Sequence, residues 1–252
     1  MSRAALQLVG DWTSGRLLGR ILGAIDSPWE PAPAGLTHRD THETCIVRLH
    51  PPDTTLPEAF AAGDSATLPS LTKETRDAIA THRTVLSVQP APALVGWDGA
   101  RAALRCGADM VDAGAIAVLS AGTGRAHSAD RWQALERMAQ TAEQEGDRAM
   151  LAEVLYLAFV HPLRAAAGTW RSQGMALLEA PDVQVPSSVP QTAARDAIEG
   201  VCLRTLAGRA PVEDSRVRAN PGSPTFRVQR GPDPLPPTVA AHNPYGLWRL
   251  TQ

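Results

Sequence analysis

The chain has 252 residues, 44% of them hydrophobic, so it can bury a substantial core as one large domain or two small ones. Its formal net charge of −2 excludes a global positive field that would draw the protein to nucleic acid or anionic lipid. The three cysteines (Cys45, Cys106 and Cys202) are odd in number and far apart, which indicates a reducing compartment rather than a disulfide scaffold.

Two apolar stretches bear on where the protein works. The apolar run within residues 1–15 is too short for a signal peptide. The most apolar stretch, MLAEVLYLAFV at 150–160, is shorter than the roughly 18 residues that a membrane span needs, and it contains Glu153. We therefore expect a cytoplasmic protein that has no membrane partner.

The first part of the chain combines short strands with an amphipathic helix. Residues 5–10 favour a short strand, and 14–25 place their apolar side chains on one helical face. The proline-rich stretch 27–35 disfavours a helix and is expected to be a connection. Apolar and polar residues alternate in 44–51, which predicts a strand.

The middle of the chain gives the clearest pattern. A strand at 84–89, a helix at 97–114 and a strand at 115–120 predict a β-α-β crossover with two parallel strands. A helix follows at 128–146; its expected buried stripe is Trp132, Leu135 and Met138, and its expected solvent side is Glu136, Arg137 and Glu143. We expect 152–163 to be a strand, because its β-branched and aromatic residues favour a sheet.

The last third of the chain is expected to contain one helix, followed by a proline-rich segment with little regular structure. Residues 168–185 are expected to continue the sheet, and 192–208 form an amphipathic helix that ends at the C-capping Gly208. Eight of the 21 prolines lie beyond this helix, where only 225–230 and 245–250 predict short strands, the second of them at the edge of the sheet.

Together these elements predict an α+β fold. We expect a single domain whose mixed β-sheet of about six strands is covered mainly on one face by helices. Residues 1–208 form the expected core domain. Residues 209–252 form a loop-rich extension, rich in proline and arginine, whose short edge strands pack on the same domain.

The segment AGTGRAHS at 121–128 follows an apolar strand and precedes a helix, an order that proteins use to hold phosphate. It lacks the lysine of a P-loop and the third glycine of a Rossmann fingerprint. Ser128 is the expected N-cap of the helix, and Asp130 in its first turn would repel a phosphate. The pattern therefore favours a structural turn. The alternative is a ligand or anion loop made of Gly122, Gly124, Arg125 and His127.

A metal site is the second candidate. His38, His42 and Cys45 have the spacing H-x3-H-x2-C, which could ligate zinc if their segment were helical. The segment instead runs into the strand at 44–51, where His50 would face the opposite side from Cys45. We therefore assign no metal ligand and no cofactor, and zinc stays an open alternative.

No motif identifies a catalytic nucleophile. The G-x-S-x-G pattern is absent, because GDSAT at 63–67 lacks its second glycine. Cys106 and Cys202 lie on amphipathic helices and are expected to be small core residues. His82 and His161 flank apolar strands, where a histidine more often has a structural role. We assign no catalytic residue, since only geometry can pair a serine or cysteine with a histidine.

Arginines gather towards the end of the chain. Six arginines and two acidic residues lie between 201 and 230, which leaves a local charge of +4. A solvated surface explains this bias, and the alternative is a surface that contacts an acidic protein partner. The residues of that surface are Arg216, Arg218, Arg227 and Arg230. Nucleic acid is a weaker candidate, because aromatic residues hardly interleave with the arginines.

Three segments, AIATHRTVLSV, GAIAVLSAGTGRAHSADRW and GTWRSQGMALLEAPDVQV, resemble in their order the bacterial family of domain of unknown function 4261 (DUF4261). The matching features lie within 75–190 and are His82, Gly124, His127, Ser128, Gly174, Met175, Pro181 and Asp182. Glu179 departs from the pattern, which has a glycine there. The resemblance implies an α+β fold in a bacterial, non-secreted protein. It implies an accessory or immunity role more than an enzyme and supplies no reaction.

Two functions follow from these patterns. The first is a non-enzymatic bacterial protein-binding factor, such as an immunity or secretion-system accessory protein, with a protein partner and no nucleic-acid partner. The alternative is a small-molecule- or phosphate-binding protein, or a hydrolase-like enzyme, that uses the loop at 122–127 and has His82 nearby. Of these, we expect the binding protein. The oligomeric state stays open.

Overall fold

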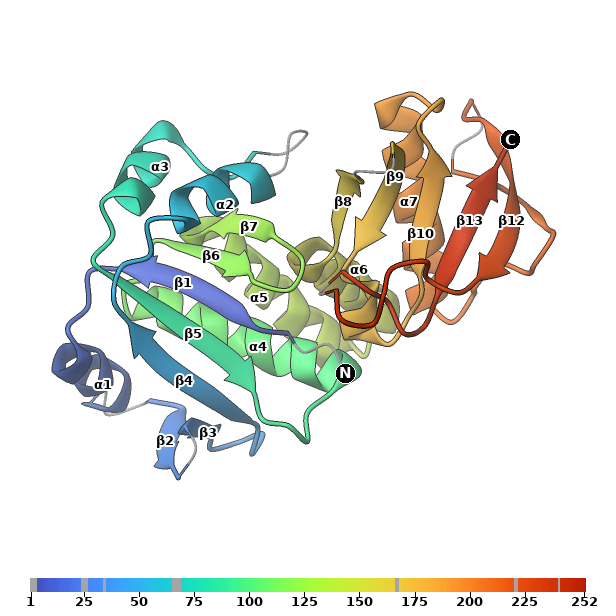
Figure 1. The fold of residues 1–252 in the computed structure, drawn as a ribbon. Helices are drawn as coiled ribbons and strands as arrows, with labels where there is room; N and C mark the ends of the chain where they lie inside the picture. The colour runs from blue at the N-terminus through green and yellow to red at the C-terminus, as the bar shows by residue number, and fades with distance from the viewer. Residues whose placement is uncertain are drawn as a thin grey trace. The chain divides into compact units, whose positions relative to one another are not determined.

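The computed structural model describes residues 4–23, 27–33, 35–64, 69–165, 168–219, 222–239 and 241–252. The chain divides into two compact units, an N-terminal unit at Arg3–Gln140 and a C-terminal unit at Thr141–Gln252. Each unit has its own β-sheet and its own helices (Figure 1). The predicted α+β class is confirmed, but the strands form two sheets where we expected one.

The sheet of the N-terminal unit has the order β2-β3-β4-β5-β1-β6-β7, and every neighbouring pair is antiparallel. Its strands are β1 (Leu6–Gly10), β2 (Trp29–Ala32), β3 (Gly35–His38), β4 (Thr44–His50), β5 (Thr84–Pro90), β6 (Ala117–Ser120) and β7 (Arg125–Ser128). The helices are α1 (Ser14–Gly23), α2 (Leu56–Gly63), α3 (Lys73–Ala80), α4 (Gly96–Asp112) and most of α5 (Ala129–Glu145). Residues 24–25 of the first predicted helix and 65–67 of the GDSAT segment lie outside the described residues.

The predicted crossover is present but split. β5, α4 and β6 follow one another as expected, and the two strands run in the same direction. However, β1 lies between them, with Leu8 paired to Leu86 on β5 and to Val118 on β6. The unit is therefore a split β-α-β arrangement, in which an early strand is inserted between the two parallel strands.

The two faces of this sheet are packed differently. Leu6 points towards α4, where a Cβ added at Gly107 would lie 2.8 Å from its Cδ1 atom. On the opposite face, Val9 and Val85 join a buried cluster with Phe60 of α2 and the α3 side chain Ile79. In Figure 1, α4 and α5 lie behind the sheet, whereas α2 and α3 lie over the end near β7. The second face is therefore only partly covered by helices.

The β2–β3 hairpin replaces the proline-rich connection that we expected. Pro31 is tolerated because β2 is an edge strand, where a missing N–H breaks no ladder bond. The indole of Trp29 is buried and donates its Nε1–H to Asp109 Oδ2 of α4 at 2.6 Å. Burial raises the pKa of Asp109 to about 6, even though this hydrogen bond favours the carboxylate. One indole thus fastens the hairpin to the helix.

The helix α5 confirms part of the predicted stripe and corrects one residue. Trp132 and Leu135 are fully buried, and the Trp132 Nε1–H donates to the Leu104 carbonyl at 3.1 Å. Glu136, which we expected in solvent, is buried and accepts two hydrogen bonds from the Arg101 guanidinium, at 2.6 and 2.8 Å. It lies four residues after Trp132, so it belongs to the same face of the helix.

The predicted strand at 152–163 is wrong over most of its length. Residues Arg148–Phe159 form the helix α6, and only His161–Arg164 form a strand, β8. The Asp147 carboxylate caps α6 by accepting from the N–H groups of Ala149 and Met150, both at 2.9 Å. Because α6 is buried on most sides, its sequence lacks the alternation of polar and apolar faces that identifies a surface helix.

The sheet of the C-terminal unit has the order β11-β12-β13-β10-β9-β8, and only β10 and β13 are parallel. Its further elements are β9 (Thr169–Gln173), the short 3-10 helix η1 (Met175–Leu178), β10 (Asp182–Pro186), α7 (Gln191–Leu206), β11 (Arg216–Arg218), β12 (Thr225–Gly231) and β13 (Leu247–Thr251). The helix α7 packs on β9 and β10, and Gly208 follows it with a left-handed φ of +73°.

The two predicted strands of the extension are confirmed as β12 and β13. The second is not an edge strand, because β13 lies between β12 and β10. β11 to β13 belong to the same sheet as β8 to β10, and the predicted boundary at 208/209 stays a prediction. Among the described residues, no helix is long and apolar enough to cross a membrane.

Candidate functional site

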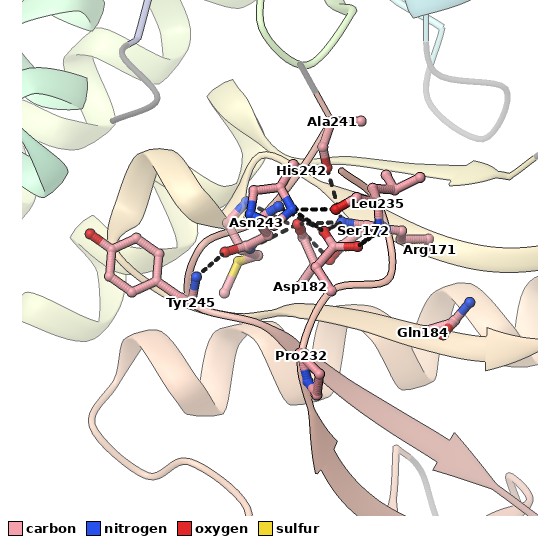
Figure 2. A network of polar contacts seen from close by, with 12 residues as sticks. Arg171, Ser172, Asp182, Gln184, Pro232, Leu235, Ala241, His242, Asn243 and Tyr245 are labelled. Carbon is pink, nitrogen blue, oxygen red and sulfur yellow. Dashed lines mark hydrogen bonds and ion pairs between the residues drawn. The ribbon is translucent and has the colours of Figure 1, made fainter. Parts of the chain in front are cut away.

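A buried polar network joins β9, β10 and the loop between β12 and β13 in the C-terminal unit (Figure 2). Arg171 of β9 donates to both carboxylate oxygens of Asp233, at 3.1 and 2.5 Å. The same guanidinium donates to the Ala241 carbonyl at 3.0 Å and reaches Asp182 of β10 at 3.4 Å. Asp233 and Ala241 come from the long loop between β12 and β13, so one arginine ties this loop to two strands.

Asp182 is the second centre of the network. It accepts hydrogen bonds from the Ser172 hydroxyl and from the Asn243 side-chain amide, each at 2.8 Å. Burial raises the pKa of Asp182 above its ordinary value, although Asn243 and Arg171 favour its charged form. Burial is the largest single influence on Asp233 and raises its pKa, but the charge and hydrogen bond of Arg171 and the N–H groups of Leu235 and Asn243 together outweigh it, so the pKa of that carboxyl is lowered.

The burial of this network favours a role in stabilising the fold over a role in ligand binding. The charged side chains of Arg171, Asp182 and Asp233 are at most 8% exposed. Asn243 is also buried, and its Nδ2 donates to the Ala180 carbonyl at 3.0 Å as well as to Asp182. Removing one member of such a buried ionic network costs about 3–5 kcal/mol, because the remaining charge is left buried.

The residue that departs from the DUF4261 pattern has an unusual backbone conformation. Glu179 caps η1 with φ +57° and ψ +35°, the left-handed region that glycine adopts most readily. The Glu179 side chain also forms a hydrogen bond with the Tyr245 phenol. Burial and a hydrogen bond with Glu179 raise the pKa of the Tyr245 phenol. The chain therefore keeps a glycine-like turn without glycine, just ahead of Pro181 and Asp182.

The glycine segment forms the turn of a β-hairpin, not the start of a helix. Thr123 and Gly124 both donate their backbone N–H to the Ser120 carbonyl, at 3.2 and 2.8 Å. These N–H groups are therefore used within the turn and do not point at a ligand. The helix α5 starts after a further strand, with Ser128 accepting from the Arg131 N–H at 3.2 Å, so the predicted cap is confirmed.

The other residues of the proposed anion loop lie on β7. Arg125 is half-buried, and His127 is 3% exposed and packs on the Trp132 ring, with centroids 5.4 Å apart. Gly122 and Gly124 remain in the turn between β6 and β7, so the four residues are divided between a turn and a strand. An anion-binding role for them stays a prediction.

The histidines and cysteine of the zinc alternative point to different places. Cys45 is buried against α4, whereas His50 is exposed on the opposite face of β4, as the alternation predicts. His38 stacks edge-on against Trp29, with ring centroids 5.1 Å apart, and its Nδ1 accepts from the Thr41 N–H. In the part of the chain that the structure describes, no three His, Cys, Asp or Glu residues gather to hold a metal ion.

The cysteines are buried, as expected of core residues. Contact with the Cys45 thiol and burial together raise the pKa of Cys106 well above its ordinary value. Burial is also the largest cause that raises the pKa of Cys202. Both thiols therefore stay protonated, and a protonated, inaccessible thiol is a poor nucleophile.

A groove opens on the partly covered face of the N-terminal sheet. It has a volume of about 450 Å³ and is lined by Gln7, His50, Pro51, Pro52, Asp53, Thr54, Val85 and Ser87. Within it, His50 Nε2 and Ser87 Oγ lie 2.8 Å apart. Sequence reasoning missed this pair because the two residues are 37 positions apart and meet diagonally across two strands.

His82 fixes the loop that follows β4 through a hydrogen bond. Its Nε2 accepts from the Asp53 N–H at 3.0 Å, and its Nδ1–H donates to the Ile79 carbonyl at 2.7 Å. Both ring nitrogens are therefore used, which fits the structural role that histidines at strand ends commonly have. The side chain is 9% exposed and is not part of the groove lining.

Three of the four arginines of the predicted partner surface share one side of a β-ribbon, which we call the arginine face (Arg216, Arg218 and Arg227). Arg216 lies directly opposite Arg227, and Arg218 lies opposite Thr225. All three arginines are exposed, whereas the alternate residues Phe226 and Val228 are fully buried.

Arg230 does not belong to this face. It lies opposite Trp248 on β13, with its guanidinium carbon 4.5 Å from the centre of the ring, and it donates to the Tyr245 carbonyl. The sequence therefore grouped four arginines that the pleat of β12 divides into three and one.

Fold and sites together define an α+β protein with an exposed arginine face in one unit and a polar groove in the other. No family model matches this chain, and neither a curated protein nor a solved structure matches it. The resemblance to DUF4261 therefore stays a prediction, and the function has to be argued from the two sites.

Proposed function

We propose that the protein is a bacterial protein-binding factor of the cytoplasm, such as an immunity or secretion-system accessory protein, and that this binding role is non-enzymatic. The observation that carries this proposal is the arginine face, where Arg216, Arg218 and Arg227 project from one exposed side of β11 and β12. Its partner is a protein that presents an acidic surface, the chemical complement of clustered guanidinium groups.

The charges within the face favour an anion from outside the unit. Arg216 and Arg227 occupy directly opposite positions, where like charges destabilise a sheet. Asp214 forms an ion pair with Arg227 at 2.9 Å, but the two side chains are 62% and 59% exposed, so solvent screens the pair. Carboxylates of a partner would accept paired hydrogen bonds from the guanidinium groups and relieve this repulsion.

The same face is less suited to nucleic acid. The side chains that share it along β11, β12 and β13 are arginine, threonine, glutamine and one leucine, and none is aromatic. Proteins that bind single strands usually stack the bases on aromatic rings. The formal charge of −2 on the whole chain also opposes a polyanion.

Charge reversal tests the proposal. The wild-type protein is expected to recover a stoichiometric acidic protein from the lysate of its native cell, with a dissociation constant that rises with salt. The double variant Arg216→Glu, Arg218→Glu should weaken this binding about tenfold or more, because like charges then face each other. The matched control is Arg39→Glu, which reverses an exposed arginine in the N-terminal unit and should leave the binding unchanged.

Three outcomes would overturn the proposal. The first is a wild-type protein that stays a partnerless monomer in that lysate. The second is a partner whose affinity the double variant leaves unchanged. In the third, the wild-type protein binds a DNA or RNA duplex and the double variant does not, which would assign the arginine face to nucleic acid.

A further inference from the structure

We propose that the groove of the N-terminal unit is an acyl-transfer site in which Ser87 is the nucleophile and His50 the general base. The carrying observation is the distance of 2.8 Å between Ser87 Oγ and His50 Nε2, inside a solvent-accessible groove of about 450 Å³. A nucleophile activated by a base needs a hydrogen bond of this length. The site is separate from the arginine face, which lies in the other unit.

The sheet holds the serine in a fixed position. Ser87 lies in the middle of β5, which pairs with β4 on one side and with β1 on the other. Its neighbours in the same row are Arg48 and Gln7. Ser87 Oγ is 3.4 Å from the Arg48 carbonyl, so its nearer and stronger acceptor is His50 Nε2. The hydroxyl proton therefore points at the base when the imidazole carries its own proton on Nδ1.

The histidine is held by the chain that follows it. His50 ends β4 and precedes Pro51 and Pro52, whose rings fix their φ angles. The next residue, Asp53, donates its N–H to the buried ring of His82. The loop behind His50 therefore has little freedom, which keeps the imidazole over the strand that carries Ser87.

The reaction that this geometry supports is the transfer and hydrolysis of a short acyl ester. Ser87 Oγ attacks the carbonyl carbon while His50 Nε2 takes the hydroxyl proton. The tetrahedral intermediate then expels the alcohol, which takes that proton and leaves an acyl-serine. Water attacks the acyl group with the same base, which releases the carboxylic acid and restores the serine.

Other groove residues suit such a substrate. The Gln7 side chain lies on the strand next to Ser87, where its amide N–H can donate to the oxyanion. Val85, Pro51 and Pro52 give the groove an apolar part for a short acyl chain. A volume of about 450 Å³ lies in the range of small-molecule sites.

The experiment uses the full chain with two probes. A fluorophosphonate reacts with an activated serine by forming a phosphorus–oxygen bond and losing fluoride, and p-nitrophenyl acetate reports acyl transfer through released nitrophenolate. We expect one fluorophosphonate adduct in the peptide that contains Ser87, and none in Ser87→Ala. His50→Gln should slow both reactions about 100-fold, the usual contribution of a general base.

Matched controls separate chemistry from folding. Ser215→Ala changes a serine of the other unit, and His42→Gln changes an exposed histidine on the loop between β3 and β4, so both should react like the wild type. Added imidazole should restore part of the rate in His50→Gly, which a purely structural histidine would not permit. The proposal is wrong if Ser87 stays unlabelled in the folded wild type, or if His50→Gln labels at the wild-type rate.

Discussion

Replacing Asp109 with asparagine should stabilise the N-terminal unit at neutral pH. In the wild type, Asp109 Oδ2 accepts the Trp29 indole N–H at 2.6 Å, and burial raises its pKa from 3.8 to about 6. Above pH 6 the folded protein therefore holds a buried negative charge that the unfolded chain keeps in water. Asparagine keeps an oxygen acceptor for Trp29 and removes that charge.

The size of the effect follows from the pKa difference. A shift of about two units, at 1.36 kcal/mol for each unit, corresponds to about 3 kcal/mol as an upper limit. Folded Asp109 binds its proton more tightly than the unfolded chain does. The unfolding free energy therefore falls as pH rises from about 4 to about 6 and stays low above that range. The variant should lack this fall and gain about 1–3 kcal/mol at pH 7.

Urea unfolding curves at several pH values between 3.5 and 7.5 would measure this difference. Carboxylates far from Asp109 contribute equally to both proteins, so the difference between wild type and Asp109→Asn reports Asp109 and the few groups coupled to it. Glu136 and Asp112 raise the pKa of Asp109 as well, and Arg105 opposes them. A gain that is the same at every pH, or a less stable variant at pH 7, would refute the reasoning.

Three further substitutions test other parts of the structure. Asp233→Ala should lower the unfolding free energy of the C-terminal unit by about 3–5 kcal/mol, because Arg171 loses its bidentate partner; a loss below about 1 kcal/mol in urea would show that the network is unimportant. Glu179→Gly should relieve about 1 kcal/mol of left-handed strain, seen as a higher unfolding midpoint, and an absorbance titration should show a lower pKa for Tyr245. Gly63→Ala should destabilise by about 1–3 kcal/mol, since its Cβ would lie 2.0 Å from a backbone oxygen of the β6–β7 turn, and an unchanged melting temperature would contradict this close approach.

Local patterns predicted several elements correctly, for physical reasons. The alternation in 44–51 placed Cys45 and His50 on opposite faces of β4, because side chains on a strand alternate whatever the strand pairs with. Ser128 was identified as an N-cap because capping depends only on the first turn of the helix. Such features need no knowledge of distant residues.

The predictions were wrong where residues distant in the sequence determine strand order or burial. The insertion of β1 between β5 and β6 depends on strand pairing across the whole unit, and the sequences of β5 and β6 contain no local pattern that indicates it. Glu136 was expected in solvent because a lone carboxylate avoids burial, and its partner Arg101 lies 35 positions away. Its spacing of four from Trp132 was nevertheless a signal that could have placed it on the buried face.

The candidate sites show the same division. The arginine cluster was visible as a local charge, and the structure only separates Arg230 from the other three. The groove could not be predicted from the sequence, because His50 and Ser87 come together only when β4 and β5 pair in one particular register. A slip of one residue would turn Ser87 to the other face and abolish the pair.

The parallel pairing of β10 with β13 has a consequence for how the protein is made. Asp182 and its partner Asn243 are 61 positions apart, so β10 leaves the ribosome well before the segment that pairs with its edge and gives Asp182 an amide donor. Until that segment emerges, the nascent chain exposes an unpaired strand edge and a carboxylate without its amide donor. The C-terminal unit should therefore close late during synthesis, and this interval is when chaperones would engage it.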